Sequence, residues 1–191
     1  MAGCHLVQTV GQEDDHRSDR RAGVRPAHRR YVRLALAGIN VNLIVVSDHG
    51  MVQTSNERVI FIDDYTDTSE VRIIDWSPLF QLWPKPGKEE AVYRRMTGAH
   101  PRLQVYRAAE IPDRLHYRNH RRIAPIIALA EEGWSITTRS SHRSSSGGNH
   151  GYDNALESMQ AISLARGPAF RQGIVVDPVE NIHNNIIKVK P

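Results

Sequence analysis

Asp48 and His49 are the residues of this 191-residue sequence whose types and spacing most clearly suggest chemistry. They close an apolar run in NLIVVSDHGM, residues 42–51, and are followed by Gly50. A carboxylate oxygen and a neutral imidazole nitrogen are ligands that suit zinc. Neighbouring residues on a strand point to opposite faces, so both can reach one ion only if the backbone turns at once, which Gly50 permits. An acid and a histidine at a strand end can equally form a hydrogen-bonded pair or a helix cap.

His150 is the second candidate ligand. It lies in GGNHGYDN, residues 147–154, between glycines that allow the backbone to approach a ligand closely. A single loop histidine is more often an exposed side chain than a ligand, so this motif alone leaves both interpretations open. The acid pair Asp63 and Asp64 follows an apolar run and is typical of a turn or helix cap. The sequence contains no G-x-S-x-G elbow, no phosphate-binding P-loop and no dinucleotide-binding glycine fingerprint.

The elements that must position these residues alternate between strands and helical or loop stretches. The continuous apolar run at 41–48 predicts a strand buried on both faces, as in a parallel sheet. Further strands are predicted within 59–65, within 71–87 before a proline-rich turn, within 103–112, and on both sides of a turn at Gly133 within 124–139. Helices are predicted at 28–39 and 88–99, a flexible serine- and glycine-rich loop at 139–151, and an irregular segment at 1–30. This alternation predicts an α/β fold.

The bulk composition is that of a soluble globular protein, with 40% hydrophobic and 24% charged residues. No segment approaches the roughly 18–20 apolar residues that a membrane-spanning helix needs. The N-terminus lacks a basic region followed by an apolar one, so it does not resemble a secretory signal peptide. The single cysteine excludes an internal disulfide framework. None of these features indicates the compartment or the oligomeric state.

A basic arm accounts for most of the net charge of +4. Residues 1–33 contain seven arginines and four acidic residues. Such an arm could bind nucleic acid by neutralising phosphates. It has no interleaved aromatic residues on which bases could stack, which argues against nucleic acid and favours a solvated segment.

Several longer stretches together carry a family resemblance. They are VNLIVVSDHGM at 41–51, VIFIDDY at 59–65, the segment from HPRL to GWSI at 100–136, GNHGYDNALESMQAISLARGPAF at 148–170, and PVENIH at 178–183. In order and spacing, the sequence resembles the nucleotide pyrophosphatase/phosphodiesterase family (type I phosphodiesterases) of the alkaline phosphatase superfamily. The resemblance covers roughly residues 40–183. It implies a mostly parallel sheet flanked by helices, of which this chain would hold an incomplete copy.

The resemblance also implies an activity and a set of ligands. Enzymes of this family hydrolyse phosphodiester and pyrophosphate bonds, often in nucleotides, with two zinc ions and a threonine nucleophile. Asp48 and His49 would bind one zinc and His150 the other. Two metals about 3.5–4 Å apart can clamp a transferring phosphoryl group and activate the nucleophile. The partner implied is a small nucleotide or phosphodiester, and family members commonly work in the periplasm, outside the cell or at its surface.

The chain also departs from the family pattern. The family's threonine, an early aspartate and a D-x-x-G-H-like pair lie upstream of the SDHGM motif, and residues 1–47 supply none of them. We therefore expect the C-terminal part of a catalytic domain at 39–183, a basic irregular leader at 1–38 and a divergent tail at 184–191. Such a chain would hold zinc weakly, lack the family nucleophile and show little or no hydrolysis. Its uncovered strand edges and apolar face would favour aggregation.

Two alternatives stay open at this point. The Asp-His-Gly sequence recurs across the superfamily, so a phosphomonoesterase or phosphonate hydrolase is the first. The combination of GWSI, HGYDN and GPAF favours the phosphodiesterases over it. The second alternative is a non-catalytic remnant or interaction module whose basic arm contacts an acidic partner.

Overall fold

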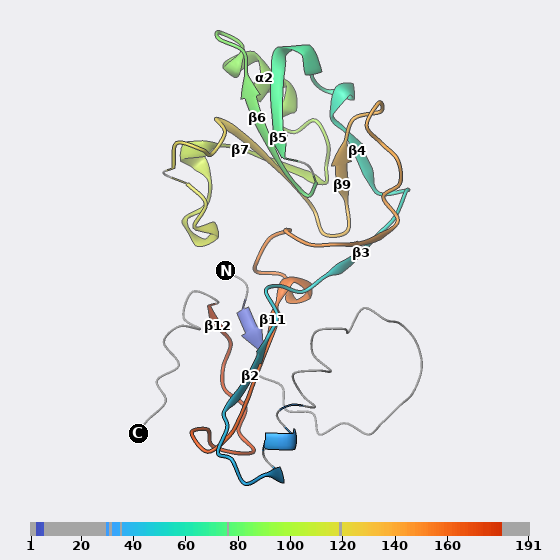
Figure 1. Cartoon of the computed structure of the whole chain (residues 1–191). Coiled ribbons are helices and arrows are strands. Elements are labelled where there is room, and N and C mark those ends of the chain that lie inside the picture. Colours follow the sequence, from blue (N-terminus) through green and yellow to red (C-terminus); the bar gives the residue numbers. More distant parts are fainter. Residues whose placement is uncertain are drawn as a thin grey trace. The chain divides into compact units, whose positions relative to one another are not determined.

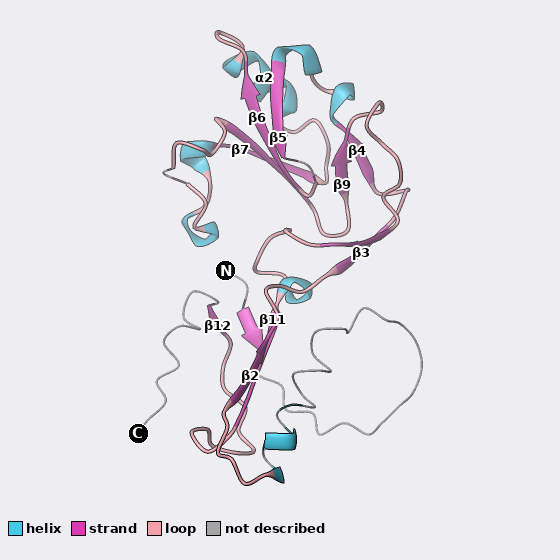
Figure 2. Cartoon of the chain, viewed as in Figure 1, coloured by secondary structure: helices cyan, strands magenta, loops and turns pink. Residues whose placement is uncertain are grey.

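The computed structural model of the chain describes residues 3–5, 30, 32–34, 36–75, 77–118 and 120–180 (Figure 1). The chain divides into two compact units. The first comprises residues 1–3 and 49–160, and the second comprises residues 4–48 and 161–191. Strands and a few short helices are mixed in the described residues, which confirms the predicted α/β class (Figure 2).

The largest element of the first unit is a four-stranded sheet in the order β5-β6-β8-β7. Its strands are β5 (Val71–Asp75), β6 (Leu79–Pro84), β8 (Ile126–Ala130) and β7 (Leu103–Arg107), and every neighbouring pair is antiparallel. All five residues of β8 are buried, as expected for a central strand without polar residues. The prediction of a proline-rich turn across LFQLWP is wrong, because this segment is β6. Proline stands only just before the strand and at its last residue, where a missing N–H is tolerated.

Helix α2 (Glu89–Met96) confirms the helix predicted at 88–99. Two fully buried residues on one face, Val92 and Met96, join the apolar core of this unit. On its exposed face, Glu90 and Arg94 form an i, i+4 ion pair, with Oε1 and Nε 2.6 Å apart. The remaining core side chains come chiefly from the sheet and from the strand pair described next; the fully or almost fully buried ones include Ile60, Ile62, Phe80, Leu82, Ile126 and Ile136.

Two smaller ladders complete the first unit. Strand β4 (Val59–Phe61) runs parallel to β9 (Ser135–Thr137), and β3 (Val52–Thr54) runs antiparallel to β10 (Gly147–Asn149). Strand β10 lies inside the loop predicted to be flexible, so that prediction is wrong for residues 147–149. The connections contain short 3-10 helices: η1 (Ile62–Asp64), η2 (Thr68–Glu70), η3 (Ala108–Glu110), η4 (Asp113–Leu115) and η5 (Glu157–Met159).

The second unit contains one sheet in the order β12-β1-β11-β2. Its strands are β12 (Val179–Glu180), β1 (Gly3–His5), β11 (Ala161–Arg166) and β2 (Leu43–Val46), with β1 parallel and β2 antiparallel to β11. Most strand pairs of the described residues are antiparallel, so the mostly parallel sheet that the resemblance implied is wrong for this part of the chain. The prediction that 41–48 is buried on both faces is wrong. Ile44 and Val46 are 46% and 54% exposed, because β2 ends the order of its sheet and has one strand neighbour among the described residues.

The N-terminal predictions have mixed outcomes. Residues 3–5 form β1, so the prediction of an irregular 1–30 is wrong there; three residues paired through their backbones need no side-chain pattern. Residues 30, 32–34 and 36 are helical and precede Gly38 at φ +73°, which confirms the predicted helix where it is described. Most of the leader at 1–38, most of the basic arm, and the tail at 184–191 lie outside the described residues. None of the described helices has the length and apolar character needed to cross a bilayer.

Candidate metal centre

The β3–β10 ladder brings two of the predicted ligands together. Its register pairs Asn149 with Val52, so the chain that continues to His150 runs beside the chain that enters from His49. The two imidazole rings are stacked, with centroids 3.6 Å apart and planes 16° apart. Residues 101 positions apart in sequence therefore lie in direct contact, both within the first unit.

A backbone hydrogen bond fixes the orientation of His49. Its Nδ1 lies 2.7 Å from the carbonyl oxygen of Gly50. A carbonyl can only accept, so Nδ1 carries a proton and donates it to Gly50. Metal-binding histidines typically donate their second ring N–H to a carbonyl or carboxylate in this way. The donor set at His49 therefore fits zinc.

Gly50 is the position that holds this turn against the segment at 158–160. A Cβ atom at Gly50 would lie 2.0 Å from the carbonyl oxygen of Ser158 and 2.9 Å from that of Gln160. The Gly50 N–H donates to the carbonyl of Met159 at 3.1 Å. Only glycine allows so close a backbone approach. Sequence reasoning recognised the conformational freedom of Gly50, but not this packing.

The residues after His150 anchor its loop to the first unit. Gly151 adopts φ +91°, a conformation that favours glycine. Tyr152 is buried, and its hydroxyl donates to the carbonyl of Trp134 at 3.0 Å. Burial raises the pKa of the Tyr152 phenol. The loop therefore enters the apolar core two residues after His150.

A second anchor of the same loop is an ion pair. Asp153 accepts two hydrogen bonds from the Arg114 guanidinium, at 2.6 and 2.5 Å, and a third from the Ala155 N–H at 2.9 Å. The bonds from Arg114 hold the pKa of the Asp153 carboxyl below its usual range. The positions Tyr152 and Asp153 thus hold the loop that carries His150. In the sequence, these two residues could be recognised only by their position directly after His150 and Gly151.

Asp48 is placed differently from the two histidines. Asp48 is exposed. The boundary between the two units falls directly after it, so Asp48 belongs to the second unit and His49 to the first. The described residues contain no group of three or more histidine, cysteine, aspartate or glutamate side chains arranged to hold one metal ion. In the described residues, the structure therefore brings together the pair His49 and His150 rather than a three-residue ligand set.

The geometry of the pair restricts how it could bind metal. A lone pair of an imidazole nitrogen lies in the plane of its ring. Two stacked rings therefore cannot aim at one shared ion between them without rotating. Binding of one ion by each ring is compatible with the stacking.

Comparison with known proteins gives a consistent assignment. A family model described as type I phosphodiesterase/nucleotide pyrophosphatase matches residues 33–153. The ectonucleotide pyrophosphatase/phosphodiesterase family member 5 of Homo sapiens is 51% identical over 132 residues, which cover 69% of this chain and 28% of that protein. The bis(5'-adenosyl)-triphosphatase ENPP4 of Homo sapiens is 43% identical over 143 residues, which cover 74% and 31%. The chain thus spans less than a third of the length of these two relatives.

Solved structures agree with the sequence relatives. Murine ectonucleotide pyrophosphatase/phosphodiesterase 5 superimposes with a TM-score of 0.71 at 49% identity, over 76% of this chain and 39% of that one. An inactive form of the same murine protein, in complex with AMP, superimposes equally well, with a TM-score of 0.71. The α/β architecture predicted from the sequence is therefore that of a part of these structures.

Proposed function

The chain belongs to the type I phosphodiesterase/nucleotide pyrophosphatase family, and from this premise we propose that it carries part of a zinc-dependent hydrolytic centre. The bonds cleaved at such a centre are the phosphodiester and pyrophosphate bonds of nucleotides. The observation that carries the proposal is the contact between His49 and His150, whose rings stack at 3.6 Å. Two residues distant in sequence meet where a metal ligand set is expected.

Three residues of this chain would serve as ligands. Asp48 and His49 would bind one zinc ion, and His150 would bind the other. His49 supports this assignment through its Nδ1–H, which donates to the Gly50 carbonyl as the second ring nitrogen of metal-binding histidines typically does. Zinc bound there would polarise a phosphoryl oxygen and stabilise the charge that develops on it. The protein's own contribution is to hold both imidazoles in fixed positions through the β3–β10 ladder and through the anchors at Tyr152 and Asp153.

The names of the relatives support a nucleotide substrate. One is a bis(5'-adenosyl)-triphosphatase, and another has been solved in complex with AMP. Both belong to the class of small nucleotides expected from the sequence. This support favours the phosphodiesterase function over the phosphomonoesterase and phosphonate hydrolase alternatives.

We further propose that these 191 residues alone bind zinc weakly and hydrolyse little substrate. Catalytic zinc sites supply three protein ligands, whereas the proposed assignment gives two to one ion and one to the other. The family's threonine nucleophile and D-x-x-G-H-like pair are absent from residues 1–47. A part of a catalytic centre is therefore the function we assign to this chain.

Zinc stoichiometry, measured by elemental analysis after dialysis against trace metal, tests the ligand assignment. We expect weak, sub-stoichiometric binding that His150→Ala reduces further. A matched control is His120→Ala, because His120 is an exposed histidine outside the pair. Equal zinc in the His150→Ala and parent chains would contradict the assignment. Two tightly held zinc ions would contradict the incomplete ligand set.

An activity assay tests the second part of the proposal. The chain is supplied with saturating zinc at mildly alkaline pH and a chromogenic phosphodiester. We expect no hydrolysis above the zinc-only background. Turnover that Asp48→Ala abolishes would show that the chain is catalytically competent, and the proposal of inactivity would then fail.

A further inference from the structure

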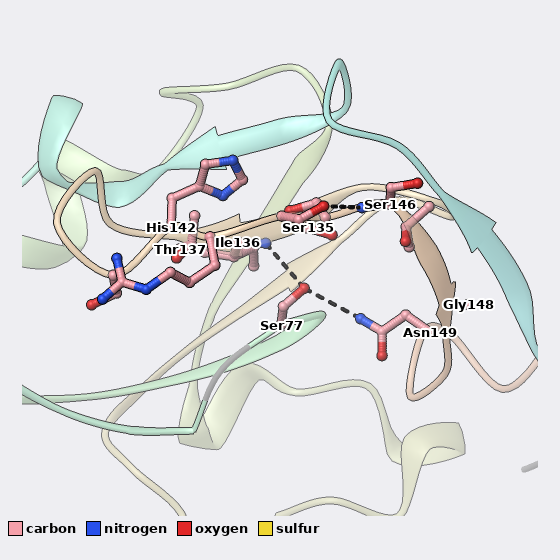
Figure 3. Close-up of a pocket in the computed structure, with 13 residues that line it drawn as sticks. Ser77, Ser135, Ile136, Thr137, His142, Ser146, Gly148 and Asn149 are labelled. Carbon is pink, nitrogen blue, oxygen red and sulfur yellow. Dashed lines mark hydrogen bonds between the residues drawn. The ribbon is translucent and has the colours of Figure 1, made fainter.

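A polar pocket lies beside β9 and β10 in the first unit (Figure 3). Its volume is about 520 Å³, within the range of small-molecule sites. The residues that matter for its chemistry are Thr54, Ser77, Ser135, His142, Arg143 and Asn149. The pocket is therefore lined largely by hydroxyl groups and contains one guanidinium. None of the residues that serve as proposed zinc ligands lines it.

Two of the lining hydroxyl residues, Thr54 and Ser135, are held almost rigidly in place because most of each residue is buried. Thr54 is 5% exposed and Ser135 is 6% exposed. In the described residues neither hydroxyl is paired with another side chain or backbone group, and neither oxygen is one of the fully buried unpaired atoms, so both face the open space of the pocket. Both hydroxyls can therefore donate to a ligand in the pocket.

Ser77 offers a third hydroxyl, whose acceptor capacity is already used. Its Oγ accepts from the Ile136 N–H at 3.1 Å and from the Asn149 amide at 3.5 Å (Figure 3). A serine hydroxyl has two acceptor lone pairs and one proton. In the part of the chain that the structure describes, the Ser77 hydroxyl donates no hydrogen bond, so its proton can be donated to a ligand.

The charge of the lining is positive. Arg143 lines the pocket, and within the described ranges it has no carboxylate partner. No aspartate or glutamate lines the pocket. The acids of η1 are engaged elsewhere: Asp63 accepts from the Arg139 N–H at 3.0 Å, and Asp64 pairs with the Arg139 guanidinium at 2.8 Å. The guanidinium of Arg143 is therefore not neutralised by its surroundings.

Side-chain and backbone hydrogen bonds hold the loop that carries Arg143. Asn56 Oδ1 accepts from the Ser145 N–H at 2.7 Å and from the Ser144 hydroxyl at 3.3 Å. The Ser141 and His142 N–H groups both donate to the Thr138 carbonyl, at 3.2 and 2.9 Å. These bonds fix the loop on both sides of Arg143, which reduces the ordering that binding would require.

From these observations we propose that the pocket binds a tetrahedral oxyanion, as free phosphate or as the phosphate group of a small molecule. Arg143 would provide the charge-assisted hydrogen bonds, and the hydroxyls of Thr54, Ser77 and Ser135 would donate to the remaining oxygens. Hydroxyls alone would also suit an uncharged polyol. The unpaired guanidinium and the absence of lining carboxylates favour the anion. This proposal does not depend on zinc or on the histidine pair.

The test is a titration of inorganic phosphate into the full chain, followed by amide NMR shifts of residues 135–149 at constant ionic strength. Metal is first removed with a chelator, and the chelator is removed by dialysis, so that zinc cannot bind the phosphate. We expect saturable shifts that Arg143→Gln weakens about tenfold or more, the loss typical of a charge-assisted hydrogen bond. Arg121→Gln is the matched control, because Arg121 is exposed and outside the pocket; it should bind like the parent.

Further arms identify the source of the oxyanion and the role of the hydroxyls. Phosphate and AMP should bind, whereas adenosine and glycerol should not; tighter binding of AMP than of phosphate would identify a phosphorylated molecule as the ligand. Ser135→Ala changes little volume and should weaken phosphate several-fold. Equal binding in the Arg143→Gln and Arg121→Gln variants would overturn the proposal, as would glycerol binding without phosphate binding.

Discussion

Replacing Gly50 by alanine should damage both the stability of the first unit and the histidine pair. The added Cβ would lie 2.0 Å from the Ser158 carbonyl oxygen and 2.9 Å from that of Gln160. Both obstacles are backbone atoms, so a side-chain rotation cannot relieve the clash. The backbone at Gly50 and the segment at 158–160 would have to move apart, and the hydrogen bond from the Gly50 N–H to the Met159 carbonyl would be lost.

The expected magnitude follows from these two effects. Overpacking typically costs about 1–3 kcal/mol, and a lost backbone hydrogen bond about 1 kcal/mol. We therefore expect the free energy of unfolding to fall by about 2–4 kcal/mol, a large share of the roughly 5–15 kcal/mol of an ordinary domain. Because Gly50 accepts the Nδ1–H of His49, zinc affinity should also fall, by about 10-fold or more.

Urea unfolding followed by tryptophan fluorescence measures this change, because all three tryptophans of the chain lie between residues 49 and 160. Gly148→Ala is the matched control. Its Cβ would lie 2.6 Å from the sulfur of Met51, a flexible side chain that is 60% exposed and can move aside. We expect this control to stay within about 1 kcal/mol of the parent. If Gly50→Ala is no less stable than Gly148→Ala, the close backbone approach at Gly50 does not restrict the chain.

Three further predictions concern the fold. Phe80→Ala empties a fully buried site in the main core and should lower the free energy of unfolding by about 3–5 kcal/mol in the same urea assay. Replacing the exposed Ile44 and Val46 by lysine should reduce aggregation in light scattering, and a parent chain that is monodisperse and unfolds in one sharp transition would contradict this expectation. A hydrogen bond from Lys88 is the main cause that lowers the pKa of Glu70 from 4.5 to about 2. Because the unfolded chain then binds more protons, the stability that Glu70 contributes is present above pH 4.5 and lost as pH falls toward 2, and Glu70→Gln should flatten this part of the urea-derived pH profile.

The elements that could be predicted from the sequence are those with a strong local pattern. Helix α2 has apolar residues on one face, paired charges on the other and a glycine at its end. Strand β8 is a continuous apolar run, and both were confirmed. Strand β6 was missed because its flanking prolines are typical of a turn, although its interior reads as a strand. The exposure of β2 could not be predicted, because an apolar run indicates a strand but not how many neighbours it will have.

The two histidines of the candidate centre could be selected from the sequence, but their contact could not. His49 and His150 were identified by residue type and by family resemblance. Their contact depends on the β3–β10 ladder, and the β10 strand consists of Gly147, Gly148 and Asn149, residues that rarely favour strands. This strand exists because its backbone groups pair with those of β3, a long-range effect that leaves no local signal.

The β3–β10 ladder contributes to both proposed sites, so a loss of zinc binding or of phosphate binding must be distinguished from a loss of the ladder itself. Thr54, Gly148 and Asn149 of this ladder line the polar pocket, and Asn149 directly precedes His150 in the chain. A substitution that breaks the ladder would therefore abolish both phosphate and zinc binding. His150→Ala should leave phosphate binding intact, and Arg143→Gln should leave zinc binding intact, because neither side chain contributes to the ladder's backbone pairing. Loss of both functions in either variant would therefore indicate a folding defect, whereas a selective loss would assign each residue to its own site.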